Sequence, residues 1–326
     1  MTASRRTFTL AALACACLAG LPGLAAAQTF PAKPIRIVVP FPAGSSTDIV
    51  ARTVSVRLAE RLKQPVLIDN KPGANGTIAA KVVTESPADG YTLFMGTVAQ
   101  AVGAAFLPQP ATSYMVKDLV PVTMTTSAPL MVVVRPSLPV HNVAELIAYA
   151  KKTSKPVTFG SGGNGTANHL SGELINDMAK IKMQHIPYKG AIAAMTDVIS
   201  GEIDALIGSI VDLKPQVDAG KVRAIGVTSA KRTPALPDVP AIAETLKGFD
   251  VVGWHGLMAP VGTPQPVIDL LYRETAEVLK MPDVRAKLEQ GGATPVGSAP
   301  QEFGKFVKGE VTKWAAVVKS SGATID

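Results

Sequence analysis

Residues 156–177, with the sequence PVTFGSGGNGTANHLSGELIND, are the stretch that decides the fold. Thr158 and Phe159 favour a short β-strand, and a run rich in glycine follows them. Apolar residues then recur at a four-residue interval, as they do on one face of a helix. The pattern predicts a strand, a glycine-rich turn and a helix, which is the repeating unit of α/β folds.

The glycine-rich turn is a candidate anion site. A helix that begins at such a turn has unpaired backbone N–H groups at its start, and these groups and the helix dipole favour a negative charge. Ser161, Asn164 and Thr166 add side-chain hydrogen bonds. The turn therefore predicts a cradle for a carboxylate or a phosphate, although a plain tight turn would use the same glycines.

Two nucleotide-binding motifs share part of this spelling. Gly160, Gly162 and Gly165 match G-x-G-x-x-G, and the outer two also match the frame of a phosphate loop. The phosphate loop needs a lysine directly after its last glycine, where a threonine and an alanine follow here. The dinucleotide motif needs an acidic residue at the end of the next strand, and residues 185–189 contain none. Nucleotide binding is therefore disfavoured.

The N-terminus predicts a signal peptide that ends at residue 27. Arg5 and Arg6 precede an uncharged apolar run at residues 10–24, and residues 25–27 supply an A-x-A cleavage pattern. The run is shorter than the roughly 20 residues of a membrane span. We expect export to the periplasm by the Sec or the twin-arginine route, and the paired arginines are compatible with both.

The mature chain is expected to have 299 of the 326 residues and no cysteine, since Cys15 and Cys17 lie in the leader. This excludes a disulfide, a thiolate nucleophile and a cysteine metal site. Its 30 basic and 25 acidic residues are spread without a basic block, and only 5% of the full chain is aromatic, so a nucleic-acid surface is not expected. The mild positive charge suits an anionic ligand or simple solubility.

Strands and helices alternate along the rest of the chain, which indicates an α/β protein. A buried strand at residues 35–39 precedes a second small-residue loop and a helix, so the first unit is repeated. Further strands are predicted at 66–68, 91–95, 185–188, 203–208 and 221–227. Helices are predicted around Ile78, Val82 and Val83 and at 143–150, 191–199, 266–280 and 300–319.

Two long β-rich segments, residues 120–134 and 249–258, are predicted to cross between domains. Two crossings imply that the first domain is built from both ends of the chain. The predicted division is residues 28–125 with 253–326 in domain 1, and residues 126–252 in domain 2.

Six motifs in order resemble the Bug-type substrate-binding receptors of tripartite tricarboxylate transporters. They are FPAGSSTD at 41–48, NKPGANG at 70–76, ADGYTL at 88–93, HIPYKG at 185–190, LPDVP at 236–240 and APVGTP at 259–264. The resemblance implies a two-lobed periplasmic binding protein fold, in which each lobe is a mostly parallel sheet flanked by helices and two crossover strands form the hinge. It also implies a monomer that binds a small mono-, di- or tricarboxylate and presents it to integral-membrane permease subunits.

The resemblance places the ligand between two loops that use backbone amides, hydroxyls and ordered water. The matching residues are Ala43, Gly44, Ser45, Ser46, Thr47 and Asp48 in one lobe and Ser161, Gly162, Asn164, Gly165, Thr166 and His169 in the other. We add Phe41, Thr97, Gly163 and Asp204 to the candidate site, since ligands bind at strand ends in open α/β sheets. Ser45 and Asn75 stand where the family usually has glycine, so the identity of the acid stays open.

Other chemistry has weaker support. His141, His169, His185 and His255 lack paired metal-ligand spacing, so no metal and no cofactor is expected. His169 could touch the ligand or be a core histidine, and Asp204 could order water or cap a strand. A secreted hydrolase with a cleft serine, Ser161 or Ser46, is the alternative, but the G-x-S-x-G elbow is missing. A surface interaction protein would be a third class.

Overall fold

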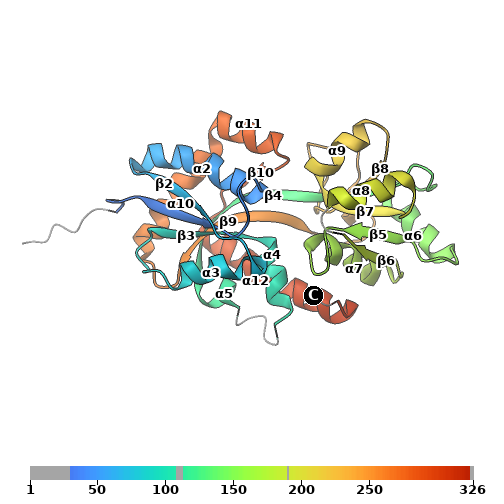
Figure 1. Cartoon of the computed structure of the whole chain (residues 1–326), viewed down its shortest axis with the longest axis horizontal. Coiled ribbons are helices and arrows are strands. Elements are labelled where there is room, and N and C mark those ends of the chain that lie inside the picture. The colour runs from blue at the N-terminus through green and yellow to red at the C-terminus, as the bar shows by residue number, and fades with distance from the viewer. Residues whose placement is uncertain (1–29, 108–112, 189–190, 324–326) are drawn as a thin grey trace, which may run out of the picture. The chain divides into compact units, whose positions relative to one another are not determined.

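The computed structural model describes residues 30–107, 113–188 and 191–323 (Figure 1). Contacts divide the chain into the units Met1–Ala32 and Lys33–Asp326, and the strands and helices labelled in Figure 1 belong to the second unit. The predicted signal peptide and both cysteines lie outside the described residues, as do Lys189 and Gly190 of the HIPYKG motif.

A sheet of ten strands runs through Lys33–Asp326 in the order β2-β1-β3-β9-β4-β7-β5-β6, and β8 and β10 both pair with β4. The strands are β1 Ile35–Val39, β2 Val66–Asn70, β3 Thr92–Thr97, β4 Leu119–Val134, β5 Thr158–Ser161, β6 Gln184–Pro187, β7 Ala205–Ser209, β8 Arg223–Val227, β9 Val252–Pro260 and β10 Thr294–Pro295.

The sheet contains two parallel sets of strands. β2, β1 and β3 are parallel to one another, and so are β6, β5 and β7. The 16-residue strand β4 connects them, because its first part pairs antiparallel with β9 and its second part pairs antiparallel with β7 and β8. The predicted α/β fold is confirmed, as a mixed sheet in which each parallel set continues into antiparallel strands.

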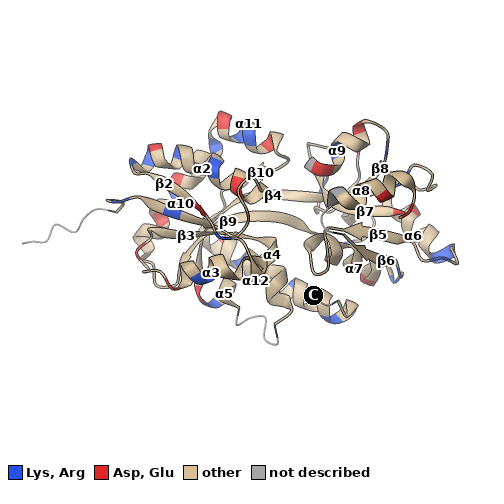
Figure 2. Ribbon diagram, in the orientation of Figure 1, with Lys and Arg blue, Asp and Glu red and all other residues tan. Residues whose placement is uncertain are grey.

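Helices cover both faces of the sheet (Figure 1). They are α2 Ser46–Leu62, α3 Thr77–Thr84, α4 Val98–Ala105, α5 Tyr114–Lys117, α6 Val143–Lys152, α7 Ala167–Ala179, α8 Ala191–Ser200, α9 Ile210–Asp218, α10 Gln265–Lys280, α11 Pro282–Gln290 and α12 Pro300–Ser321, with short 3-10 turns η1 Ala74–Gly76 and η3 Ile242–Glu244. Charged residues of both signs lie mostly on the helices and loops, and the strands carry few (Figure 2). That distribution follows from the burial of the strands between helical layers.

Helix α12 packs on the sheet through a buried aromatic cluster. Trp254 of β9 meets Phe303 of α12 edge to face, with the ring centroids 5.5 Å apart. Glu310 is buried in the cluster and accepts hydrogen bonds from the indoles of Trp254 at 3.3 Å and Trp314 at 3.1 Å. Gly256 allows this contact, because a Cβ atom there would collide with the ring of Phe303.

The two predicted crossover segments are strands, but they differ. Residues 120–134 fall in β4, which pairs with both parallel sets. Residues 249–258 overlap β9, which begins at Val252 opposite Pro129 and then pairs only with β3 and β4 in the described part of the chain. The proposed domain boundaries at residues 125 and 253 therefore fall in or beside the two strands that link the sets.

Four helices and one strand escaped the sequence analysis: α4, α5, α9, α11 and β10. Helix α9 contains Pro215, which usually interrupts a helix, and α5 is a single turn. Helix α4 follows β3 with no intervening residue. Such short or proline-containing segments carry too few apolar repeats to be recognised from periodicity.

Candidate functional site

A cavity of about 530 Å³ opens where the two parallel sets meet β4. Thr97 at the end of β3 lies opposite His255, and His255 lies opposite Thr126 of β4. Ser209 at the end of β7 lies opposite Leu130, four residues further along β4. The carboxyl ends of β3 and β7 are thus directed at the same stretch of β4, and both line the cavity.

The N-termini of three helices surround this cavity. Its lining includes the first residues of α2, α4 and α9, the middle of β4, the start of β9 and the end of α11; these residues are Phe41, Gly44, Ser46, Thr47, Ile49, Val50, Thr97, Val98, Ala99, Ala128, Leu130, Ser209, Ile210, Asp212, Gly253, Trp254, His255, Lys287, Leu288, Gly291, Gly292 and Ala293. Three helix starts directed at one space make it favourable for a negative group.

The loop before α2 is held by a buried carboxylate. Ser45 is the N-cap and accepts a hydrogen bond from the Asp48 amide. The carboxylate of Asp48, 2% exposed, accepts from the Gly44 amide, from Arg52 Nε and from Asn70 Nδ2, each at 2.9 Å. Burial acts to raise the pKa of Asp48, but these hydrogen bonds outweigh it and the pKa is lowered. Asp48 therefore shapes the loop and is already occupied by partners within it.

The start of α4 is fixed by a capping box. The Thr97 hydroxyl accepts from the Ala99 amide, and the side-chain oxygen of Gln100 accepts from the Thr97 amide at 2.8 Å. Gln100 also donates to the carbonyl of Asn75. Gly76 leaves room for this side chain, since a Cβ there would collide with Gln100, and its φ of +87° suits glycine.

Helix α9 presents a similar start from the other parallel set. Ser209 caps it by accepting from the Asp212 amide, and its hydroxyl donates to the Asp212 carboxylate at 3.0 Å. The sequence analysis missed this helix and both cavity-lining residues. The signal was present, because Ser and Asp three residues apart directly after a strand form an N-cap pattern.

Asp212 and Lys287 are the charged side chains in the described lining of the cavity, and most of the remainder is apolar. Lys287, on α11, is exposed, and its ammonium group makes no hydrogen bond or ion pair within the described residues. The cavity thus offers helix amides, one ammonium group and a largely apolar wall. This chemistry suits a small organic anion with a hydrocarbon body.

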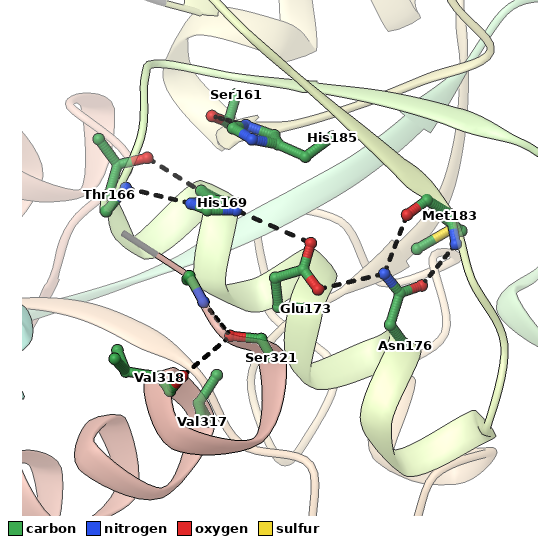
Figure 3. A network of polar contacts seen from close by, with 12 residues as sticks. Ser161, Thr166, His169, Glu173, Asn176, Met183, His185, Val317, Val318 and Ser321 are labelled. Carbon is green, nitrogen blue, oxygen red and sulfur yellow. Dashed lines mark hydrogen bonds and ion pairs between the residues drawn. The ribbon is translucent and has the colours of Figure 1, made fainter. Parts of the chain in front are cut away.

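The glycine-rich turn satisfies several of its own backbone groups. The Ser161 hydroxyl accepts from the Gly163 amide, the Thr166 hydroxyl accepts from the His169 amide, and His169 Nδ1 accepts from the Gly165 amide at 3.1 Å. Figure 3 shows His169 between Thr166 and Glu173 on α7. The turn is therefore more self-contained than the glycine pattern suggested.

Two histidines stack beneath this turn. The rings of His169 and His185 have centroids 3.7 Å apart and are inclined by 15°. Burial and the neighbouring His169 lower the pKa of His185 to about 4, and burial lowers the pKa of His169. Both rings are therefore neutral at pH 7, and the close stack avoids the repulsion that two positive imidazoles would have.

Ser161 and His185 form a hydrogen-bonded pair, with Oγ and Nε2 2.7 Å apart. The pair looks like the nucleophile and base of a hydrolase, but Ser161 is 0% exposed, and its hydroxyl also bonds to both backbone groups of Gly163. A substrate cannot reach this oxygen. The arrangement holds the turn and does not favour catalysis.

Asp204 lies at the opposite end of its strand from the cavity. It directly precedes β7, whereas Ser209 at the far end of β7 lines the cavity. Its carboxylate accepts from Arg135 Nε at 2.9 Å and from the Thr158 amide at 3.0 Å. Asp204 caps the start of the parallel set, so we remove it from the candidate site.

The structure brings together Phe41, Gly44, Ser46, Thr47 and Thr97 of the predicted site in the cavity lining. Ala43, Ser45 and Asp48 belong to the same loop without lining the cavity. Ser161, Gly162, Gly163, Asn164, Gly165, Thr166 and His169 are not in the lining either, although β5 runs parallel to β7 and its carboxyl end faces the same way. Their contact with a ligand stays a prediction.

The described ranges 30–107, 113–188 and 191–323 contain no cluster of three or more His, Cys, Asp or Glu side chains placed to hold a metal ion. No helix in the same ranges is both long and apolar enough to cross a membrane.

The mixed α/β sheet with strands and helices arranged in this way is that of the periplasmic binding proteins, a class of solute receptors. A model of the tripartite tricarboxylate transporter family receptor (TctC) matches residues 50–323. The chain belongs to this family. The predicted resemblance is confirmed, and because the family consists of solute-binding receptors, the protein is not an enzyme.

Individual relatives agree with this assignment. The chain is 35% identical over 309 residues to Protein BugT of Bordetella pertussis, covering 94% of this chain and 95% of that one. It is similar to the structure of Rpa4515 from R. palustris with adipate, with a TM-score of 0.74, 34% identity and coverage of 90% and 99% of the two chains. It is also similar to MatC from Rhodopseudomonas palustris with bound malate, with a TM-score of 0.70, 32% identity and coverage of 89% and 100%.

Proposed function

We propose that this protein captures a small organic carboxylate in the cavity between its two parallel sets of strands and delivers it to the permease subunits of a tripartite tricarboxylate-type transporter. The observation that carries the proposal is the convergence of the α2, α4 and α9 N-termini on one cavity of about 530 Å³. The adipate and malate held by two similar receptors support the ligand class.

The ligand carboxylate is proposed to lie against the starts of α2 and α4. There the lining consists of small residues, Gly44, Ser46, Thr47 and Ala99, that let an oxygen approach the backbone. The hydrocarbon part of the acid then faces Ile49, Leu130 and the other apolar residues of the wall. The glycine-rich turn at residues 161–166 is proposed to join the site when the two sets close over the ligand, by bending at β4 and β9.

The remaining parts of the proposal concern the setting. The N-terminal signal peptide directs the chain to the periplasm, residues 28–125 with 253–326 form one lobe and residues 126–252 the other, and the receptor acts as a monomer. Size-exclusion chromatography with light scattering of the mature protein tests the last point, since a mass near that of one chain is expected.

The direct test is a thermal-shift screen of the purified mature protein against mono-, di- and tricarboxylates and aromatic acids, followed by calorimetry. At 100 times the dissociation constant, a ligand stabilises the fold by about 2.7 kcal/mol, which is readily seen as a rise in Tm. The ligand should be recovered unchanged by chromatography after incubation. A flat response across the whole acid library would overturn the proposal.

A further inference from the structure

His255 occupies a central position in the floor of the cavity. Thr97 of β3, His255 of β9 and Thr126 of β4 lie directly opposite one another across three neighbouring antiparallel strands. Residues opposite each other in such a ladder point to the same face of the sheet. His255 therefore lies beside Thr97, the N-cap of α4, and lines the cavity there.

The hydrogen bond to Thr126 sets which ring nitrogen of His255 carries the proton. Thr126 is 0% exposed, and its hydroxyl oxygen lies 2.9 Å from His255 Nδ1, the one hydrogen bond of this hydroxyl within the described residues. If Nδ1 donated the proton, the buried threonine O–H would have no acceptor, which costs about 1–3 kcal/mol. The threonine therefore donates to Nδ1, and the proton of the neutral ring is on Nε2.

The Nε2 atom is open to the cavity. Within the described residues, Nε2 has no hydrogen-bond partner. The side-chain atoms there that lack a partner and are also completely enclosed are Ser113 Oγ and Thr275 Oγ1, so Nε2 is not enclosed. His255 is 9% exposed, and that exposed part belongs to the cavity lining. Burial lowers the pKa of His255 to about 4, so the ring is neutral at pH 7.

We propose that His255 is a specificity-determining residue that donates a hydrogen bond from Nε2 to the ligand carboxylate at the N-terminus of α4. The inference rests on the proposed function and adds a residue outside the two loops that the sequence pointed to. Because the His255 ring is neutral and its tautomer is fixed, Nε2 can donate to a ligand oxygen without a full positive charge being buried in the floor of the cavity. Lys287, by contrast, is an exposed cation on α11.

The tautomer is tested by nitrogen-15 NMR of the histidine-labelled full mature protein. In the ligand-free protein, the nitrogen-15 chemical shifts of His255 should be those of an imidazole with a protonated, pyrrole-type Nε2 and an unprotonated, pyridine-type Nδ1. Adding the best carboxylate from the screen should move the Nε2 resonance and leave the Nδ1 resonance in place. A pyridine-type Nε2, or an Nε2 resonance indifferent to saturating ligand, would refute the inference.

Calorimetry of variants gives an independent measurement. His255→Phe keeps the ring volume but removes the donor, and we expect the Kd for the carboxylate to rise about 10-fold to 100-fold, as for a hydrogen bond to a charged group. His255→Gln keeps an N–H donor and should lose less than His255→Phe. His141→Gln is the matched control, because His141 is exposed and outside the cavity lining.

The outcomes separate this inference from the proposed function. If the wild-type protein binds no carboxylate, the proposed function fails. If the wild type binds and His255→Phe, with an unchanged Tm, binds within 2-fold of it, the inference fails alone. If His255→Phe does not fold, the comparison of His255→Gln with the wild type and the Nε2 resonance still decide.

Discussion

The loop before α2 and the glycine-rich turn before α7 both open a helix at the carboxyl end of a parallel strand, but they are stabilised by different chemistry. The first is held by an ionised carboxylate, Asp48, with a guanidinium and two amide donors around it. The second is held by hydroxyls and by two stacked, neutral imidazoles, His169 and His185. The loop before α2 should therefore be destabilised by removal of the Asp48 charge, and the glycine-rich turn by protonation of its histidines in acid.

Replacing Asp48 by alanine should give the largest loss of stability. The change removes the charged acceptor that the Gly44 amide, Arg52 and Asn70 share, and hydrogen bonds to a charged group are worth about 1.5–3 kcal/mol each. We expect the free energy of unfolding to fall by about 3 kcal/mol in urea titrations, with weaker ligand binding. Asp48→Asn keeps the shape and one oxygen and should lose less. Equal stability of Asp48→Ala and wild type would contradict the role of the carboxylate.

Acid should act mainly on the glycine-rich turn. The folded-state pKa of His185 is about 4, below the ordinary 6.5, so the unfolded chain binds a proton more readily. The stability that this neutral ring contributes is fully present above pH 6.5 and is lost as the pH falls towards 4. The free energy of unfolding should drop by about 3 kcal/mol over that window through His185. Asp48, whose pKa is lowered, stays ionised there.

The variant His185→Asn isolates this contribution. His255 also has a pKa of about 4, and burial lowers the pKa of His169, so the wild-type curve contains contributions from all three histidines. Urea titrations from pH 7.5 to 4 should therefore show a smaller loss in His185→Asn than in the wild type. An identical pH dependence of the two proteins would mean that the histidine stack does not hold the turn.

Packing beneath the glycine-rich turn gives a smaller effect. Gly172 of α7 faces Phe159 so closely that a Cβ would collide with its ring, and Gly172→Ala should therefore cost about 1–3 kcal/mol through overpacking. Gly309 of α12 is the matched control, since a Cβ there meets nothing within 4 Å. Gly309→Ala should stabilise the protein by about 0.5–1 kcal/mol through helix propensity. Thermal melts of the two variants should shift in opposite directions.

The sequence predicted most of the strands, the longer helices and the α2 side of the site, because these features depend on local patterns. Five residues of the predicted site line the cavity, and they come from the loop before α2, the first turn of α2 and the end of β3. The rest depended on contacts that no local pattern contains. Asp204 pairs with Arg135 across the sheet, and the spelling of the glycine-rich turn does not reveal that its amides bond to its own side chains.

His255 illustrates the same limit. In the sequence it is one of four scattered histidines, and its role follows only from the register that places it between Thr97 and Thr126. Lys287 reaches the cavity because α11, which periodicity did not predict, packs next to α2 and β10. The family resemblance predicted the class of ligand, whereas the neighbours of each residue in the site became known only from the strand register.

Removing the N-cap hydroxyl of each loop should have the smallest effect on stability. It also compares the two loops most directly, because both N-caps are hydroxyl side chains. Ser45 accepts from the Asp48 amide at 3.3 Å, and Thr166 accepts from the His169 amide at 3.3 Å. Ser45→Ala and Thr166→Ala should each lower the free energy of unfolding by about 1 kcal/mol, the usual cost of an N-cap hydroxyl. Their effects on binding should differ, since the loop of Ser45 lines the cavity, whereas we propose that the turn of Thr166 joins the cavity only when the two sets of strands close. We expect calorimetry to show a larger rise in Kd for Ser45→Ala. If Thr166→Ala weakened binding more at equal loss of stability, the glycine-rich turn would be the principal carboxylate site, and the assignment of that role to the starts of α2 and α4 would be wrong.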